Sequence, residues 1–231
     1  MRTIIVADIH GCHSELLALL KKLKFRQDTD RLICLGDLID RGNQVYEVFD
    51  YVRTLKSDMG ERCVLIRGNH EQMLMDSVDD MFSRQMWFMN GGVETVRSFK
   101  KHRHDYARHI NWFGRMQLYF ETKDFICAHA GVRTDRMAEN TADILLWDRD
   151  SAEGNGYSGK IAIVGHTPVI DPVYLDGKGH TEVIEDRKPQ MLPSWGTICM
   201  DTGCVFGYRL TGMVIEDGMF YTDSVFWGVD G

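Results

Sequence analysis

Several short polar segments of this chain carry side chains that can bind metal ions. They combine carboxylate, imidazole and amide groups, a set that suits manganese, iron or zinc better than calcium, which prefers oxygen alone. Asp8 and His10 stand two positions apart, so both leave the same side of an extended chain and can reach one ion. The candidates are too numerous for one metal, whereas two ions bridged by a carboxylate would use them all. The candidate ligands are Asp8, His10, Asp37, Asn69, His129 and His166.

Three arginines, Arg41, Arg67 and Arg149, are candidates for contacts to phosphate. The planar guanidinium group can donate two parallel hydrogen bonds to phosphate oxygens. Glycines flank the polar segments, and glycine lets the backbone turn sharply or approach an ion closely. Phosphate is therefore an expected ligand beside the metals. The remaining histidines have no comparable setting and are assigned to solvent; they include His102, His104, His109 and His180.

The polar segments follow short apolar runs that have the composition of buried strands. Open α/β sheets place their ligands at the carboxyl ends of strands, so these runs predict one shared site. The expected strands span residues 3–7, 31–35, 63–66, 125–128 and 161–164.

Helices are expected between these strands, and the last third of the chain is expected to be mainly β. The helices cover 14–23, 45–55, 71–81 and 83–108, the last interrupted at 90–92. Strands are expected within 174–184, 197–200, 208–215 and 219–225, joined by turns such as 176–177. Since no linker or repeat divides the chain, one α/β domain over residues 1–231 is the economical prediction.

Composition restricts the possible partners. The chain has 231 residues and a net charge of −7, so no general basic surface is available for nucleic acid. The basic stretch 100–109 is interpreted as a solvated helix face, with a docking patch for an acidic substrate as the alternative. No apolar run approaches the length of a membrane span or a signal-peptide core, so a cytoplasmic protein without membrane partners is expected. The six cysteines are expected to be reduced and mostly buried, and Cys12 lies close to a proposed ligand.

Together the motifs resemble the signature blocks of the phosphoprotein phosphatases, most closely their small bacterial and phage members, the group that includes lambda phosphatase. The resemblance extends over residues 3 to 220. The blocks are Asp8-Ile9-His10-Gly11, Gly36-Asp37-Leu38-Ile39-Asp40-Arg41-Gly42, Gly68-Asn69-His70-Glu71, Trp87–Gly92, His129-Ala130-Gly131, Trp147-Asp148-Arg149, Gly165-His166 and Asp201-Thr202-Gly203.

The resemblance implies a metallophosphoesterase (calcineurin-like) sandwich of two mixed β-sheets flanked by helices. It also implies two divalent metal ions, Mn²⁺ first and iron or zinc as alternatives. Asp8 and His10 would bind the first ion and Asp37 would bridge both. The second site would be completed by Asn69, His129 and His166.

The same resemblance assigns the remaining roles. His70 would be the general acid, oriented by Asp40, while Arg41, Arg149 and Asn69 would hold the phosphoryl oxygens. A hydroxide bridging the two ions would attack phosphorus directly. The substrate implied is a phosphoserine or phosphothreonine protein or peptide.

Two alternatives remain open from the sequence. One is a dinucleoside polyphosphate hydrolase, such as a diadenosine tetraphosphate hydrolase, which would bind nucleotides at the same centre. In those enzymes the second block more often contains Ala-Arg-Gly, whereas Asp40 precedes Arg41 here. The other is a non-catalytic scaffold on the same fold, which would be expected to lack the acid or a ligand. Residues 171–193 look longer than the compact phage pattern; they form either a hairpin near the mouth that affects substrate choice or an exposed hairpin without a role.

Overall fold

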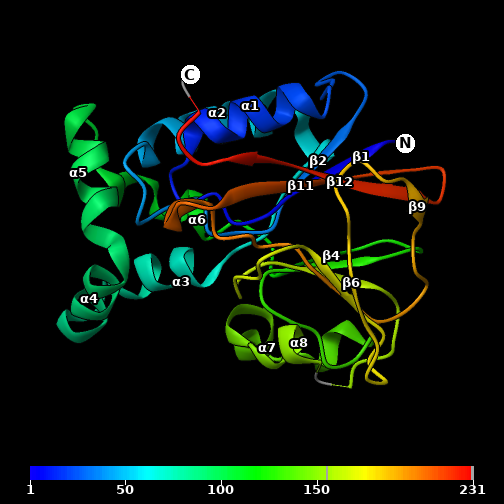
Figure 1. Ribbon diagram of the computed structural model, residues 1–231. Helices are drawn as coiled ribbons and strands as arrows, with labels where there is room; N and C mark the ends of the chain where they lie inside the picture. The colour runs from blue at the N-terminus through cyan, green and yellow to red at the C-terminus, as the bar shows by residue number, and fades with distance from the viewer. Residues whose placement is uncertain (155, 230–231) are drawn as a thin grey trace.

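Two mixed β-sheets packed face to face form the centre of the protein in the computed structural model (Figure 1). The structure describes residues 1–154 and 156–229, and within these each sheet has six strands. In spatial order the first sheet contains β3 (Cys63–Leu65), β2 (Arg31–Cys34), β1 (Thr3–Val6), β11 (Arg209–Glu216), β12 (Met219–Phe226) and β9 (Gln190–Met191). The second contains β4 (Tyr119–Glu121), β5 (Ile126–Ala128), β6 (Ala162–Val164), β10 (Thr197–Cys199), β7 (Val173–Leu175) and β8 (Thr181–Val183). The expected sandwich of two mixed sheets is confirmed.

The strands that precede the polar segments run parallel within each sheet. β1 pairs with β2, and β2 with β3, all parallel, while β5 pairs parallel with β6 in the other sheet. The loops that leave these strands therefore emerge at the carboxyl edge of each sheet. The remaining neighbour of β1 is β11, which is antiparallel.

Alternation along each strand divides the apolar side chains between two layers of core. In β1, Ile4 and Val6 face the helices above the first sheet, whereas Ile5 faces the second sheet. In β5, Cys127 points inward to the same inter-sheet core, and Ile126 points outward. Both faces of the strands that precede the polar segments are thus buried, which explains why these strands are continuous apolar runs.

Helices cover the outer faces of the sandwich (Figure 1). α1 (His13–Lys22) and α2 (Val45–Met59) lie over the first sheet, and α7 (Ala142–Trp147) and α8 (Asp150–Glu153) over the second. A further group extends to one side: α3 (Asn69–Asp76), α4 (Met81–Trp87), a π-helical segment (Phe88–Gly92), α5 (Val93–Lys101) and α6 (Ile110–Phe113). Short 3₁₀ segments span Gly60–Arg62, Tyr106–His109, Met137–Glu139 and Cys204–Phe206.

The expected helices over 71–81 and 83–108 were wrong in their boundaries. α3 ends at Asp76, and a new helix begins because the carboxylate of Asp80 accepts hydrogen bonds from the backbone of Phe82 and Ser83. The second helix ends at Lys101 instead of continuing to 108. The predicted interruption at 90–92 is present as the π-helical kink, where Gly91 has φ = 102°.

Residues 171–193 link the outer edges of the two sheets. β7 and β8 form the expected hairpin at the edge of the second sheet, and β9 then joins the first sheet beside β12. The segment is fastened to the first sheet by Arg187, whose Nε lies 2.9 Å from Oδ2 of Asp223, and by Asp171, which pairs with Arg209 at 2.5 Å. An influence of this segment on substrate choice remains a prediction.

All six cysteines lie in the described part of the chain, and each is free and buried, as expected. None of the helices formed by the described residues is long and apolar enough to cross a membrane.

Candidate metal centre

The loops that follow the parallel strands bring the candidate ligands together from both sheets. Asp8 and His10 follow β1, Asp37 follows β2, His129 follows β5 and His166 follows β6. Asn69 begins α3 after β3. All six side chains are buried, with exposed fractions of 7% or less. Polar groups buried in this way must be hydrogen-bonded, ion-paired or bound to a metal.

Several residues of the site have left-handed backbone conformations, which set the direction of their side chains. His10, Asp37, Asp40, Arg41 and His166 all have φ between 44° and 70°. Such conformations cost on the order of 1 kcal/mol or more for residues other than glycine and persist only where the surroundings hold them. Their concentration at one site therefore indicates that the loops are shaped for a function.

Glu71 holds two of these loops in place. Its carboxylate accepts backbone hydrogen bonds from Gly68 at 2.8 Å, Asp37 at 3.0 Å and Leu38 at 2.8 Å. Burial, followed by the nearby charge of Asp37, raises the pKa of Glu71 to about 7. Glu71 was not among the residues predicted for the site; its position directly after the Asn-His pair was the available signal.

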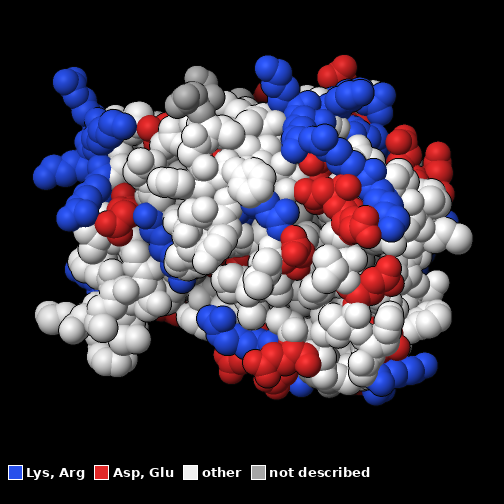
Figure 2. Space-filling model, viewed as in Figure 1, with Lys and Arg blue, Asp and Glu red and all other residues white. Residues whose placement is uncertain are grey.

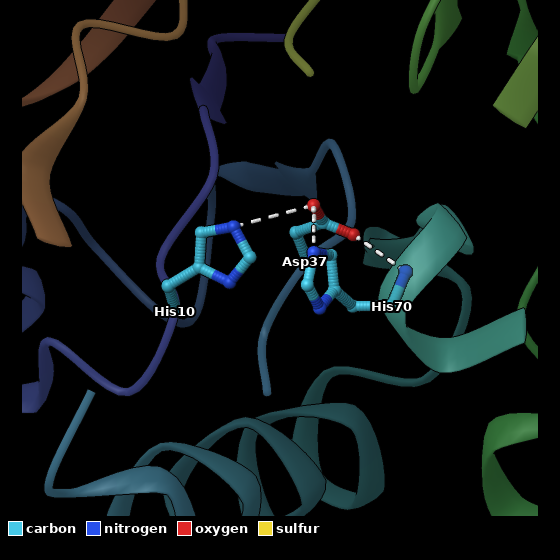
Figure 3. Close-up of side chains that lie close together, drawn as sticks. All are labelled: His10, Asp37 and His70. Atoms are coloured by element: carbon cyan, nitrogen blue, oxygen red, sulfur yellow. Dashed lines mark hydrogen bonds and ion pairs between the residues drawn. The ribbon is translucent and has the colours of Figure 1, made fainter. Parts of the chain in front are cut away.

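The carboxylate of Asp37 lies between two groups of donors. Figure 3 shows it between His10 and His70. Its Oδ2 is 3.3 Å from Nε2 of His10 and 3.9 Å from Nε2 of His70, while Oδ1 is 3.4 Å from Nε2 of His129. Asp37 is thus shared by two clusters with metal-binding potential, His10–Asp37–His70 and Asp37–His129–His166.

The second cluster also includes Asn69. Its Oδ1 lies 3.0 Å from Nε2 of His129 and 3.2 Å from Nδ1 of His166, and the two imidazoles approach within 3.2 Å. The structure therefore brings together all the residues expected at this second site.

Backbone carbonyls fix the tautomers of two histidines. Nδ1 of His129 lies 2.8 Å from the carbonyl oxygen of Leu35, and Nδ1 of His10 lies 2.8 Å from that of Ile39. Because a carbonyl only accepts hydrogen bonds, Nδ1 carries the proton in both rings and Nε2 presents a lone pair. A hydrogen bond of this kind from the other ring nitrogen is typical of metal-binding histidines.

Asp8 is placed differently from the other candidates. Its two carboxylate oxygens accept the backbone N–H of His166, each at 3.1 Å, and it belongs to neither cluster of converging donor atoms. Burial, together with Asp201 and Asp37, raises the pKa of Asp8 well above its usual value. Asp201 was not among the expected site residues, although its Asp-Thr-Gly block was recognised. Three buried carboxylates so close together create a negative field that favours a cation.

His70 and Asp40 form a buried pair beside the first cluster. Nδ1 of His70 donates to Oδ2 of Asp40 at 2.7 Å, which leaves Nε2 facing Asp37. Asp40 is also held by Nε1 of Trp87 at 2.8 Å and by Oγ1 of Thr95 at 2.5 Å. Trp87 and Thr95 were missed as supporting residues, although Trp87 begins one of the recognised blocks.

Burial shifts the pKa of both members of this pair. It raises the pKa of Asp40 to about 7 and lowers that of His70 to about 3. An imidazole with such a pKa is neutral at pH 7. His70 could therefore act as an acid only when an anion beside Nε2, such as a phosphoryl group, increases its affinity for a proton.

The three candidate arginines have different environments. Nη1 of Arg41 lies 2.7 Å from Nε2 of His10, and its backbone N–H donates to the carbonyl of Gly91. Arg149 is exposed, and its charge is one of those that lower the pKa of His166 to about 3, after burial and His129. Nη2 of Arg67 donates to the carbonyl oxygens of Gly114 at 2.8 Å and Met116 at 3.3 Å, so a contact of Arg67 to phosphate stays a prediction.

The chemistry of the donor set fits two divalent cations. The unprotonated Nε2 of His129, Oδ1 of Asn69 and Oδ1 of Asp37 all carry lone pairs, and Nε2 of His129 lies 3.0 Å and 3.4 Å from the other two. Packing lone pairs so closely is unfavourable unless a cation lies among them. Nε2 of His166 is in addition buried without a hydrogen-bond partner among the described residues.

Residues 1–192 match the profile of the calcineurin-like phosphoesterases, which is most of the chain. The chain belongs to this family. Its members use a binuclear centre of divalent metals, in agreement with the two clusters that share Asp37. Phosphoesterase chemistry and the fold expected from the motifs are thereby established.

Curated relatives within the family differ in their substrates. Serine/threonine-protein phosphatase 2 of Salmonella typhimurium is 30% identical over 74% of this chain and 85% of its own length. The symmetrical bis(5'-nucleosyl)-tetraphosphatase of Klebsiella pneumoniae is 35% identical over 96% of this chain and 94% of its own. The family relationship therefore leaves the substrate open.

Solved structures support the fold in the same way. A protein serine/threonine phosphatase from Saccharomyces cerevisiae superimposes with a TM-score of 0.68 at 17% identity, over 100% of this chain and 81% of the other. A diadenosine tetraphosphatase-type structure gives a TM-score of 0.63 at 20% identity, over 98% of this chain and 93% of the other. At these identities the likeness concerns the fold alone.

Proposed function

We propose that this phosphoesterase is a metal-dependent phosphomonoesterase that dephosphorylates serine or threonine residues of proteins, as a single domain over residues 1–231. The observation that carries the proposal is the buried His70–Asp40 pair, with Nδ1 of His70 2.7 Å from Asp40. The pair holds Nε2 of His70 toward the shared ligand Asp37.

The chemistry of the leaving group connects this pair to the substrate. Serine and threonine leave phosphorus as alkoxides, which are strongly basic and need a proton in the transition state. A nucleotide leaves from a polyphosphate as a phosphate anion, which is far less basic and needs the proton much less. A supported acid such as His70 therefore favours an alkyl phosphoester over an anhydride.

The proposed metal ligands follow the two clusters. Asp8 and His10 would hold one divalent ion, Asp37 both, and Asn69, His129 and His166 the other. Mn²⁺ is the proposed metal, with iron or zinc as alternatives, because the donors are oxygen and imidazole nitrogen. When bound, such ions make a water molecule acidic enough to supply a nucleophile and offset the charge on the phosphoryl group.

The chain's own residues orient and protonate the substrate in this proposal. Arg41, Arg149 and Asn69 would hold the phosphoryl oxygens, Arg41 from the rim beside His10 and Arg149 from the side of His166. The arriving dianion would raise the affinity of His70 for a proton, and Nε2 would then donate that proton to the departing oxygen. Asp40 would keep the ring in place and stabilise its positive form.

Hydrolysis of dinucleoside polyphosphates is the second candidate function. It is favoured by the 35% identity with the Klebsiella pneumoniae tetraphosphatase, which extends over nearly all of both chains. A non-catalytic scaffold has less support, because His70, Asp40 and all the candidate ligands are present.

The test uses metal-stripped protein that is reloaded with manganese. Phosphate release from a phosphoserine peptide and cleavage of diadenosine tetraphosphate are followed side by side, with His70→Asn as the control. The proposal expects peptide turnover that falls by roughly 10²–10⁴-fold in the variant, the usual scale for loss of a general acid. Faster cleavage of the dinucleotide than of the peptide would favour the second candidate. No hydrolysis of either substrate, with metals bound, would favour the scaffold.

A further inference from the structure

A group of cations at the end of α5 is not used by the metal centre. Residues 100–109 contain four lysines and arginines, three histidines and a single acidic residue, in a chain whose net charge is −7. In Figure 2 these basic side chains gather at the side of the molecule where Figure 1 places α5. The stretch follows the helix into the 3₁₀ segment Tyr106–His109.

Part of this group surrounds a cavity. Its volume is about 460 Å³, and its lining is formed by Lys100, Arg103, His104, Asp105, Arg108 and His109. Lys100, Arg103 and Arg108 form no ion pair with a carboxylate of the described chain. The acidic member, Asp105, accepts the backbone N–H of Ala107 at 3.0 Å. Three cations, Lys100, Arg103 and Arg108, thus face one carboxylate, Asp105, and the cavity carries an excess of positive charge.

The neighbours of His109 agree with this description. Its pKa is lowered by burial and then by its neighbours Arg53, His104 and Arg108, against a single opposing carboxylate, Asp105. Positive groups crowded in this way attract an anionic partner at long range.

A second cavity is lined both by residues next to the candidate ligand His10 and by the end of α5. It has a volume of about 510 Å³, and both Arg41 and Lys101 line it. Lys101 is the chain neighbour of Lys100, which lines the first cavity. Glu15 also lines the second cavity, where its carboxylate accepts the N–H of Gly228 at 2.9 Å, and Glu47 lies 3.8 Å from Lys101. Arg41, beside the candidate ligand His10, and Lys101, at the end of α5, thus line the same cavity.

We propose that Lys100, Arg103 and Arg108 form a docking site for an acidic peptide segment, one that lies beside the phosphorylated residue of the substrate. The choice of a phosphoprotein as the substrate rests on the proposed phosphatase function, whereas the binding of an acidic peptide to this surface does not. The site would select phosphoproteins whose phosphorylated residue lies near aspartates, glutamates or further phosphates. The charge on the cavity identifies this chemistry, since a neutral or basic peptide would gain nothing there.

The test measures binding without catalysis. The assay uses two dye-labelled peptides without phosphate: one is rich in aspartate and glutamate, and its twin has asparagine and glutamine in their place. Each peptide is titrated with the full-length protein, and binding is followed by fluorescence anisotropy. The triple variant Lys100→Gln/Arg103→Gln/Arg108→Gln is compared with a control of equal charge change, Lys123→Gln/Arg136→Gln/Lys188→Gln. Each exposed ion pair changes an equilibrium constant by a factor of roughly 1.5 to 5, so the docking variant should weaken the acidic peptide on the order of tenfold. The control should change it less than about twofold, and added salt should remove the difference.

Kinetics then separates docking from a general effect on the enzyme. With a phosphoserine peptide in an acidic context, the docking variant should raise KM by a similar factor and leave kcat unchanged. Equal weakening by both variants, or no preference of the wild-type protein for the acidic peptide over its twin, would overturn the proposal. If the acidic peptide binds as expected but no phosphopeptide is hydrolysed, the docking site stands and the proposed phosphatase function fails.

Discussion

Replacing Asp40 by asparagine separates the chemistry of the proposed acid from the architecture of the site. Oδ2 of Asp40 accepts hydrogen bonds from His70 at 2.7 Å and Trp87 at 2.8 Å, and Oδ1 accepts one from Thr95 at 2.5 Å. An amide with its oxygen at the Oδ2 position can keep the first two bonds. Its NH₂ group can donate to Oγ1 of Thr95, so the substitution removes the charge and leaves the shape.

Two different magnitudes follow from this geometry. Burial has already raised the pKa of Asp40 to about 7, so a neutral group fits the site and the free energy of unfolding should change by no more than about 1 kcal/mol. The positive form of His70, however, loses its counter-charge. Hydrolysis of an alkyl phosphoester should fall by roughly 10²–10⁴-fold, which corresponds to about 3 to 5 kcal/mol in the barrier.

The assay compares two leaving groups at equal metal content. kcat/KM of wild type and Asp40→Asn is measured for a phosphoserine peptide and for p-nitrophenyl phosphate, with metal stoichiometry and thermal stability determined on the same samples. The nitrophenolate leaving group hardly needs a proton, so its hydrolysis should fall by less than about tenfold. An equal loss on both substrates with metals still bound would refute the assignment of His70 and Asp40 as an acid and its support.

Three further predictions concern the framework of the site and the fold. Glu71→Gln points an NH₂ group at backbone donors and should lower the free energy of unfolding by roughly 2 to 4 kcal/mol in urea titrations, whereas the exposed Glu61→Gln should change it little. Gly165→Ala would place its Cβ 2.1 Å from Oδ1 of Asp8 and should weaken metal binding by about 10- to 100-fold in calorimetry; the uncrowded Gly114→Ala should bind metal normally. Burial opposes ionisation of Asp223, but Lys22 and Arg187 hold the pKa of its carboxyl below the usual value. The ionised carboxylate therefore contributes about 1 kcal/mol to the free energy of unfolding above pH 4, and this contribution is lost as the pH falls through the lowered pKa. Asp223→Asn should therefore be less stable than wild type at pH 7, with the gap closing toward about pH 2; a gap that does not depend on pH would contradict this linkage.

The parts of the fold that the sequence predicted well are those with a strong local pattern. The strands before the site are short apolar runs because both of their faces are buried, and each ends at a polar segment. Since parallel strands end at the same edge of a sheet, the runs predicted that their polar segments would share one site; the joint role of Asp37 and His129, which lie 3.4 Å apart, was implied only by the resemblance to the family. In contrast, β4 is a three-residue edge strand in which only Phe120 is partly buried, and α8 has four residues; neither carries enough periodicity to be recognised.

Interactions that depend on distant backbone were beyond the sequence analysis. Arg67 was chosen for its side-chain type, yet its bonds go to carbonyls nearly fifty residues away. Glu71 supports loops that approach it only in the folded chain. The breaks in the helical region follow from side-chain capping by Asp80, a local signal that was available in the sequence and was outweighed by the helical pattern around it.

The division of the donors between the two sheets has a mechanical consequence. Asp37 belongs to a loop of the first sheet, and His129 and His166 belong to loops of the second, so an ion bound by these three residues would join the two halves of the sandwich. A small displacement of one sheet against the other would disturb this second site, whereas the cluster of His10, Asp37 and His70 comes from the first sheet alone. Metal affinity at this second site should consequently depend on how well the inter-sheet core around Ile163 is packed, although no side chain of that core is a candidate ligand.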